Sequence, residues 1–396
     1  STLTLTGRAS LSDTLTVDYT NGSPIPTSGI SYDGGSGGND SLNLVSGAVT
    51  DVTHTFTSSS AGTVDVDGDI ITYTGLEPIS DSLTAQTRTF AFGSAADVVT
   101  LQDTGTSSDG VARISSVATS ESVDFSVPVV SIEIVLGSGN DQLTASSLDG
   151  NFVGIVTVLG GTGDDTIDAS GLTGMTSLVG SDGADVITGG AGADFILGDL
   201  GNDVIRGGDG NDSIFGGAGL DTVSGGSGMN EVLGQGTSQD LLREDVSGTV
   251  TLTSTDFETF NLTWGTGNSN LLIRNDFIEL VGSSNADDFD LSGFLHGSRP
   301  VTVLAGDGDL RRAGRPAGGV RSRRRTAHGG AVHQPVHQAT TRREHALQPD
   351  EHAPHDGTDP WSAADEPVRH GRNPDGRVLY RDAGLRPVQR RSERDS

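Results

Sequence analysis

Hydrophobic and polar residues alternate through the first 130 positions of the chain, as at Leu15, Val17 and Tyr19. A period of two places apolar side chains on one face of a β-strand, and the Asn-Gly, Asp-Gly and Ser-Gly pairs between the runs are typical of turns. The same alternation returns between residues 241 and 310. The pattern therefore predicts strands in both regions, and no segment of the first 310 residues has the periodicity of a helix.

Between these regions the apolar period changes from two to nine. Six nine-residue units follow one another in a single register from Gly180 to Leu233, and they read GSDGADVIT, GGAGADFIL, GDLGNDVIR, GGDGNDSIF, GGAGLDTVS and GGSGMNEVL. Glycine occupies the first and fourth places, aspartate or asparagine the sixth, and an aliphatic residue the eighth. These aliphatic residues are Ile187, Ile196, Ile205, Ile214, Val223 and Val232. Self-similarity at a short fixed period marks a solenoid, in which two units would form one coil of about 18 residues.

The sixth places supply the candidate chemistry. If successive units lie on opposite sides of a flattened coil, alternate units stack into two columns: Asp185, Asp203 and Asp221 in one, and Asp194, Asp212 and Asn230 in the other. Strands in neighbouring coils lie about 4.8 Å apart, and two carboxylates at that separation repel by roughly 3 kcal/mol at an effective dielectric constant near 20. Glycine turns with positive φ leave backbone carbonyls pointing at a common centre. Calcium relieves the repulsion best, because it accepts about six to eight oxygen ligands in flexible geometry, whereas magnesium prefers strict octahedra and retained water.

The units resemble the RTX, or hemolysin-type calcium-binding, nonapeptide repeat, whose pattern is G-G-x-G-x-D-x-U-x with U aliphatic. The resemblance covers residues 180–233 without a break, and it implies a parallel β-roll with calcium ions bound between successive glycine-rich turns. The metal ligands that it implies are the carboxylates of Asp185, Asp194, Asp203, Asp212 and Asp221, with backbone carbonyls around Gly189, Gly198, Gly207 and Gly216. Ser181 and Asp199 depart from the pattern at the second place, and the neutral Asn230 should make the last site the weakest. A metal-free β-solenoid that keeps glycine-rich corners is the alternative.

Degenerate copies of the unit extend beyond this array. Gly160–Asp168 carries Asp165 at the sixth place, and we add Asp165 to the expected metal ligands, whereas the copy at 171–179 has Thr176 there. Four isolated copies, Gly35–Asn43, Phe92–Thr100, Leu136–Thr144 and Gly282–Asp290, carry Asp40, Asp97, Asp141 and Asp287. For the isolated copies, an Asp-Gly turn at a solenoid corner without an ion is an equal alternative. Units start at 136, 160 and 180, so their spacing shortens along the chain, which fits wider coils that lead into the compact roll.

Composition agrees with a secreted, extended β protein. Hydrophobic residues make up 33% of the chain and aromatic residues 5%, with 58 glycines, which is too little apolar material for a large globular core. A solenoid folds nonetheless, because each coil buries its few aliphatic side chains against its neighbours. The absence of cysteine excludes disulfides, thiol catalysis and cysteine-based zinc sites. No apolar run reaches the roughly 18 residues needed to cross a membrane.

The C-terminal segment, residues 311–396, differs from everything before it. It holds 17 arginines and 11 acidic residues, a net charge of +6; because the whole chain carries −29, the first 310 residues carry −35. The segment contains no isoleucine or phenylalanine, so it cannot build a core. A repeat begins at Ala305–Asp309 but stops at Leu310. We interpret the segment as frame-shifted or disordered, since arginine codons of the form CGN become GNC codons for glycine, aspartate, alanine or valine one base later. A genuine basic tail that binds nucleic acid or an acidic surface is the alternative.

No catalytic constellation is evident in the sequence. His54 and His296 lack an accompanying nucleophile motif, and the abundant carboxylate pairs are better explained as turn residues. We therefore expect no catalytic residue and no enzyme activity. The charge of −35 makes nucleic-acid binding by the first 310 residues unfavourable.

Together these patterns predict an all-β protein, mainly a parallel β-solenoid of the β-roll or β-helix kind, with flanking β-rich coils and a disordered C-terminal tail. The expected divisions are a β-rich region at 1–130, a calcium-binding roll at 131–240, a solenoid continuation at 241–310 and the tail at 311–396. We expect a calcium-binding structural or adhesion-related segment of a large extracellular or cell-surface protein, with cell-surface or matrix components as partners. The alternative is the noncatalytic secretion or folding module of an exported hydrolase. Because the sequence opens at Ser1 without a methionine, we expect a fragment or processed form, and the sequence upstream of Ser1 would distinguish the two functions.

Overall fold

The computed structural model of the chain describes residues 2–324, with several short gaps. The gaps are 59, 77, 118–121, 235–239, 247–248, 255–258, 266–267, 274–276, 283–287, 291–300, 306–310 and 313–320. Every regular element in the described part is a β-strand, so the all-β prediction is confirmed there. A helix of the length and apolarity needed to span a membrane is accordingly absent from these residues. The expectations for His296, for Asp287 and for the tail beyond 324 lie outside the described residues.

The strands form two sheets. The first sheet has 17 strands: β1 (Leu3–Thr6), β3 (Ile30–Asp33), β5 (Ala48–Ser58), β6 (Ala61–Val66), β7 (Asp69–Thr74), β9 (Thr84–Ala91), β13 (Ser131–Ser138), β15 (Ile155–Thr162), β17 (Thr176–Asp182), β19 (Phe195–Leu200), β21 (Ser213–Ala218), β23 (Met229–Leu233), β25 (Thr249–Ser254), β26 (Thr259–Trp264), β27 (Asn268–Ile273), β29 (Asp288–Asp290) and β31 (Arg311–Arg312). The second has 15: β2 (Thr14–Asp18), β4 (Ser41–Val45), β8 (Ile79–Asp81), β10 (Val98–Asp103), β11 (Val111–Ser116), β12 (Ser122–Ser126), β14 (Gln142–Ala145), β16 (Thr166–Asp168), β18 (Val186–Thr188), β20 (Val204–Arg206), β22 (Thr222–Ser224), β24 (Leu241–Val246), β28 (Phe277–Gly282), β30 (Val301–Ala305) and β32 (Arg321–Arg324).

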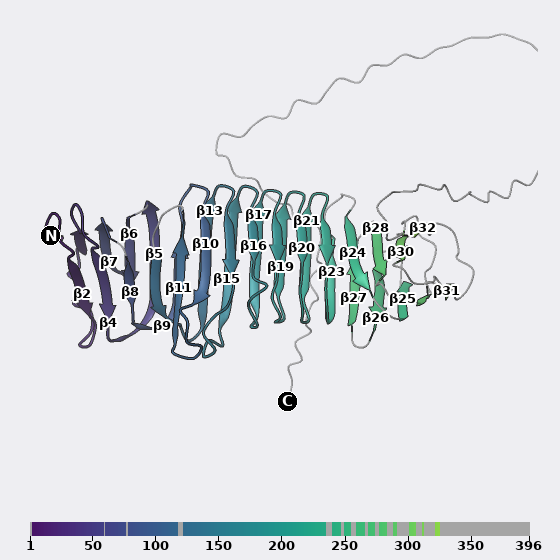
Figure 1. Ribbon diagram of the computed structural model, residues 1–396, viewed down its shortest axis with the longest axis horizontal. Helices are drawn as coiled ribbons and strands as arrows, with labels where there is room; N and C mark the ends of the chain where they lie inside the picture. The colour runs from purple at the N-terminus through teal and green to yellow at the C-terminus, as the bar shows by residue number, and fades with distance from the viewer. Residues whose placement is uncertain are drawn as a thin grey trace, which may run out of the picture. The chain divides into compact units, whose positions relative to one another are not determined.

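From β13 to β24 the chain alternates between the sheets, so that each coil adds one strand to each of them (Figure 1). Ile187 lies opposite Ile205 in a parallel pair, as a coil of two repeat units predicts. In the wider coils before it, Ile134 pairs with Val158 and Val158 with Leu178. The eighth-place aliphatic side chains all point inward and are at most 1% exposed. The parallel solenoid predicted from the period of nine is therefore confirmed.

Within the described residues, three antiparallel meanders interrupt the parallel winding: β5–β6–β7, β10–β11–β12 and β25–β26–β27. In each, the outer strands pair in parallel with flanking coils, as β7 does with β3 and β5 with β9. The first two meanders lie in opposite sheets, and they surround an aromatic core in which the rings of Phe90 and Phe125 lie 4.9 Å apart. Alternation with a period of two occurs in both kinds of pairing, so the sequence predicted strands here without predicting the meanders.

Glycine permits the close stacking of the coils. A Cβ on Gly201 would lie 1.7 Å from the carbonyl oxygen of Gly183, and one on Gly219 would lie 1.4 Å from that of Gly201. Both glycines have positive φ, at 141° and 156°. Ser181 and Asp199 replace glycine at the second place of their units and adopt φ values of 81° and 74°, which is unfavourable for residues that carry a Cβ.

The described strands continue past the boundary expected at 310. β31 pairs in parallel with β29, and β32 pairs in parallel with β30. Both strands belong to the same compact unit as the rest of the described residues. A parallel ladder uses backbone amides and carbonyls, so a change in side-chain composition does not itself end the pairing.

Candidate metal centre

The sixth-place carboxylates form a hydrogen-bonded column along one edge of the solenoid. In each coil the backbone N–H of the sixth-place residue donates to Oδ1 of the aspartate in the next coil. The N–H of Asp165 donates to Asp185 at 2.8 Å, that of Asp185 to Asp203 at 2.9 Å, and that of Asp203 to Asp221 at 3.0 Å. The structure thus places Asp185, Asp203 and Asp221 in one column, and it adds Asp165 to that column.

A second column is built from the alternate units and ends in neutral residues. The backbone N–H and the hydroxyl of Thr176 both donate to Oδ1 of Asp194 at 2.8 Å. The N–H of Asp194 donates to Asp212 at 3.0 Å, and that of Asp212 to Oδ1 of Asn230 at 2.9 Å. Asn230 donates in turn from its amide to the carbonyl of Gly226 at 3.2 Å. At the two ends of this column, the Thr176 hydroxyl and the Asn230 amide are therefore hydrogen-bonded.

The second oxygen of most of these carboxylates has no hydrogen-bond partner among the described residues. These buried Oδ2 atoms belong to Asp165, Asp185, Asp203, Asp212 and Asp221. All five side chains are at most 1% exposed. In Asp194 the same oxygen accepts the backbone N–H of Gly190 at 2.8 Å. Burying an ionised carboxylate without a partner is strongly unfavourable, so the five oxygens require a cation or a proton.

Most of these oxygens face a glycine carbonyl from the next coil. The point at which a Cβ would stand on Gly198 lies 2.3 Å from Oδ2 of Asp203 and 2.3 Å from the carbonyl oxygen of Gly216. The corresponding point on Gly207 lies 2.5 Å from both Oδ2 of Asp212 and the carbonyl oxygen of Gly225. Any side chain at the first place of the repeat unit would narrow the space between the carboxylate oxygen and the carbonyl oxygen. An acidic oxygen beside a carbonyl oxygen, with no donor between them, is the donor set that calcium prefers.

Other carboxylates of the columns also lie beside glycine carbonyls of the next coil. Gly180, Gly198 and Gly207 present carbonyls beside Asp165, Asp185 and Asp194, each within 3.0 Å of the point where the intervening glycine would carry its Cβ. In the compact coils, the glycine that provides the carbonyl follows its aspartate by the same number of residues each time, as Gly198 follows Asp185. At this offset Gly189 corresponds to Thr176, which offers a hydroxyl in place of a carboxylate. The sequence pattern missed the carbonyls of Gly180 and Gly225; the fixed offset would have identified that of Gly225.

Burial raises the pKa of these carboxyls. The pKa rises to about 7 for Asp203 and Asp212 and to about 6 for Asp165, chiefly because burial disfavours the charged form. A backbone N–H donor opposes the rise in each case, and neighbouring carboxylates add to it. The pKa values of Asp185, Asp194 and Asp221 are raised for the same first reason. Near neutral pH a proton would therefore compete with any cation that the columns hold.

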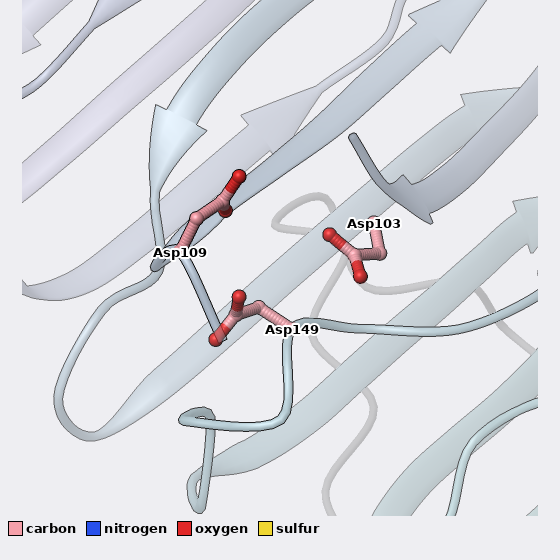
Figure 2. A group of neighbouring side chains, drawn as sticks. All are labelled: Asp103, Asp109 and Asp149. Atoms are coloured by element: carbon pink, nitrogen blue, oxygen red, sulfur yellow. The ribbon is translucent and has the colours of Figure 1, made fainter. Parts of the chain in front are cut away.

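A separate acidic group lies between two loops of the second sheet. Asp103, Asp109 and Asp149 place carboxylate oxygens within 4.8 Å of one another (Figure 2). Asp149 is 2% exposed and accepts the backbone N–H groups of Ser108 at 2.7 Å and Gly110 at 2.9 Å. Burial alone would raise the pKa of Asp149, but the pKa is lowered because its carboxylate also accepts the N–H of Asn151, which has the largest lowering effect, followed by those of Gly110 and Ser108. Asp149 thus ties the loop after β14 to the loop after β10.

A buried ionic cluster in the meander core has no signature in the sequence. Asp81 accepts hydrogen bonds from Nε2 of His54 at 3.1 Å and from the Arg88 guanidinium. All three side chains are fully buried, and Arg88 also donates to the carbonyls of Leu83 and Ser126. Burial lowers the pKa of His54. The cluster is enclosed by the core and packs against the aromatic rings of Phe90 and Phe125.

Comparison with known families identifies the repeats. The family model of the RTX calcium-binding nonapeptide repeat matches the chain in four copies, over residues 157–171, 170–205 and 197–230. No curated protein matches the chain. The match includes the copy that contains Asp165 and ends within the sixth unit, so it covers the column residues from Asp165 to Asp221 and from Thr176 to Asn230. Repeats of this family bind Ca²⁺.

Proposed function

Since residues 157–230 are RTX calcium-binding repeats, we propose that the two columns bind calcium ions between successive turns of the roll. The proposed side-chain ligands are Asp165, Asp185, Asp194, Asp203, Asp212 and Asp221, with Asn230 at the weakest site. The proposed carbonyl ligands are those of Gly180, Gly198, Gly207, Gly216 and Gly225. The observation that carries the proposal is the set of five buried Oδ2 atoms without hydrogen-bond partners among the described residues, most of them beside a glycine carbonyl.

Bound calcium would supply positive charge beside the columns. Arginines of the described residues pair with Asp13, Asp81, Asp124 and Glu279, none of which belongs to either column. The carboxylates would hold the ions, the carbonyls would complete their coordination, and the glycines of the first place would keep the space open. Calcium would then stabilise the roll, because a ligand that binds only the folded form favours it by RT ln(1 + [L]/Kd).

At the level of the whole protein we propose a calcium-stabilised structural or adhesion-related segment of a larger secreted or cell-surface protein. Support comes from a solenoid that extends through nearly all of the described residues and from the calcium-binding repeats within it. Modules of this type outside the cell have Kd values for calcium of roughly 0.1–1 mM. The segment would therefore fold fully only where calcium is abundant, and partners at the cell surface or in the matrix would meet the calcium-loaded form.

Calcium titration of the full chain by calorimetry tests the ligand set. Asp203→Asn should lower the number of bound ions by at least one, because Asp203 contributes an unpartnered oxygen in the middle of its column. Asp168→Asn is the matched control, since Asp168 is an aspartate on strand β16 of the second sheet whose carboxylate accepts the N–H of Ser170. Equal stoichiometry in the wild type and both variants would contradict the proposed ligands.

A further inference from the structure

The first carboxylate column continues beyond the RTX repeats. The N–H of Asp141 donates to Oδ1 of Asp165 at 2.8 Å, and Oδ1 of Asp141 accepts the N–H of Asp97 at 2.7 Å. These are the contacts that link the aspartates within the roll. Asp141 precedes residue 157, the first that the family model matches, and its unit has Leu136 where the pattern requires glycine.

The turn before Asp141 has the backbone of a repeat turn. Gly137 and Gly139 have φ values of 104° and 131°, against 110° and 124° for Gly161 and Gly163 in the next coil. A Cβ on Gly163 would lie 1.9 Å from the carbonyl oxygen of Gly139, the same distance as that between a Cβ on Gly183 and the carbonyl oxygen of Gly163. The coils are therefore stacked at Asp141 as closely as they are in the roll.

The side chain of Asp141 has an unsatisfied oxygen. Asp141 is 1% exposed, and its Oδ2 has no hydrogen-bond partner among the described residues. No ion pair of the described residues involves Asp141. Oδ1 of Asp141 accepts the N–H of Asp97, as those of Asp165 and Asp185 accept the N–H groups of Asp141 and Asp165, and in all three aspartates Oδ2 is buried without a hydrogen-bond partner among the described residues.

The strand register also provides a carbonyl for this oxygen. Gly137 pairs with Gly161, and Gly161 pairs with Ser181, so the positions before them, Leu136, Gly160 and Gly180, are stacked in successive coils. The carbonyl of Gly180 lies beside Asp165 at the Cβ point of Gly160. By the same register the carbonyl of Gly160 belongs beside Asp141, at the position of Leu136.

We propose that Asp141 binds a calcium ion in the wide coil formed by β13 and β14, outside the RTX repeats. The inference rests on the proposed function, because it assigns to Asp141 the role given there to Asp165 and Asp185. Oxygen donors from a carboxylate and from turn carbonyls select calcium over transition metals. Leu136 carries side-chain atoms where the repeats have a bare Cα beside the carboxylate, so this site is narrower and binds calcium more weakly than those of the roll. Through Asp97, the ion at Asp141 links the roll to the coil that begins with β10.

Calorimetry on the full chain with calcium alone tests the inference. Asp141→Asn keeps the oxygen that accepts the Asp97 N–H and removes the charge, so the variant retains the turn; we expect it to bind one ion fewer than the wild type. Asp203→Asn is the positive control and Asp168→Asn the negative one. A loss in Asp203→Asn without a loss in Asp141→Asn overturns this inference and leaves the proposed function intact. No loss in either variant contradicts the proposed ligand set itself.

Hydrogen exchange of the wild-type chain provides a second measurement that does not depend on how the variant folds. Calcium should slow exchange of the amides of Asp97 and Asp141 as well as those of the roll, with half-saturation at a higher calcium concentration for the first two. Exchange at these two amides that does not respond to calcium, while the roll becomes protected, overturns the inference.

Discussion

At the scale of single residues, backbone conformation and charge act together at Asp199. Asp199 has a φ of 74°, and its carboxylate contributes to the raised pKa of Asp203. Replacing it with glycine removes both the strain and the neighbouring charge. We expect Asp199→Gly to stabilise the calcium-free chain by about 0.5–1 kcal/mol, because relief of strain exceeds the added entropy of the unfolded chain.

Asp209→Gly is the matched control for this prediction. Asp209 also raises the pKa of a column carboxyl, that of Asp212, but it is absent from the residues with positive φ. The control should therefore lose stability or stay unchanged in chemical denaturation. If both variants gained the same stability, the effect of Asp199→Gly would come from the removed charge alone.

Protonation of the columns gives the calcium-free chain an unusual dependence on pH. Burial raises the pKa of Asp203 and Asp212 from 3.8 to about 7. A group with a raised pKa in the folded state contributes stability that is complete below its unfolded value and is lost as the pH rises through its folded value. In calcium-free buffer the roll should therefore melt at a higher temperature at pH 5.5 than at pH 8.

The calcium-loaded chain should show the opposite trend, because bound calcium requires the ionised carboxylates. Apparent calcium affinity should fall as the pH drops below about 7. Asp203→Asn should flatten the pH dependence of the calcium-free melting temperature. A wild-type melting temperature that rises between pH 5.5 and pH 8 without calcium would contradict the assignment.

At the scale of elements, the tight contact between turns makes the fourth-place glycines essential. Gly201→Ala would place a Cβ 1.7 Å from the carbonyl oxygen of Gly183, at a φ of 141°. Gly105→Ala is a suitable control, because its φ of 130° is similar and nothing lies within 4 Å of the added Cβ. We expect about 1–3 kcal/mol of strain in the control and a markedly larger loss, with reduced calcium binding, in Gly201→Ala. Similar melting temperatures would show that the coils separate easily.

The strands and turns differ in how far the sequence alone predicts them. The period of nine fixes the strand, the turn and the inward aliphatic residue together, so the roll and its columns follow directly from the sequence. The meanders could not be predicted, because antiparallel and parallel strands share a period of two. Pairing of His54 with Asp81 depends on which coils the first meander brings together, and no spacing in the sequence records it. The sequence revealed the copy that contains Asp141 but, with Leu136 at its first place, left open whether that copy holds an ion; the backbone there keeps the geometry of the repeat.

At the scale of the whole molecule, the apolar core is distributed unevenly along the solenoid. The coils around the first two meanders bury large side chains such as Phe90, Phe125 and Tyr73. In the roll, the short strands of the second sheet bury one aliphatic side chain each, as at Ile187 and Ile205. Stability in a solenoid is the sum of local terms and of contacts between neighbouring coils. Without calcium the roll therefore combines little apolar burial with a concentration of buried carboxylates.

Calorimetric melting of the full chain should consequently show two transitions without calcium. With calcium, both transitions should occur at higher temperatures and lie closer together in temperature. We assign the lower transition to the roll and the upper one to the coils of residues 2–130. Asp203→Asn should shift only the lower transition in calcium. Phe125→Ala should shift the upper one, since truncating a buried aromatic side chain costs about 3–5 kcal/mol. A single transition that does not respond to calcium would mean that the meander core, and not the metal columns, determines the stability of the roll.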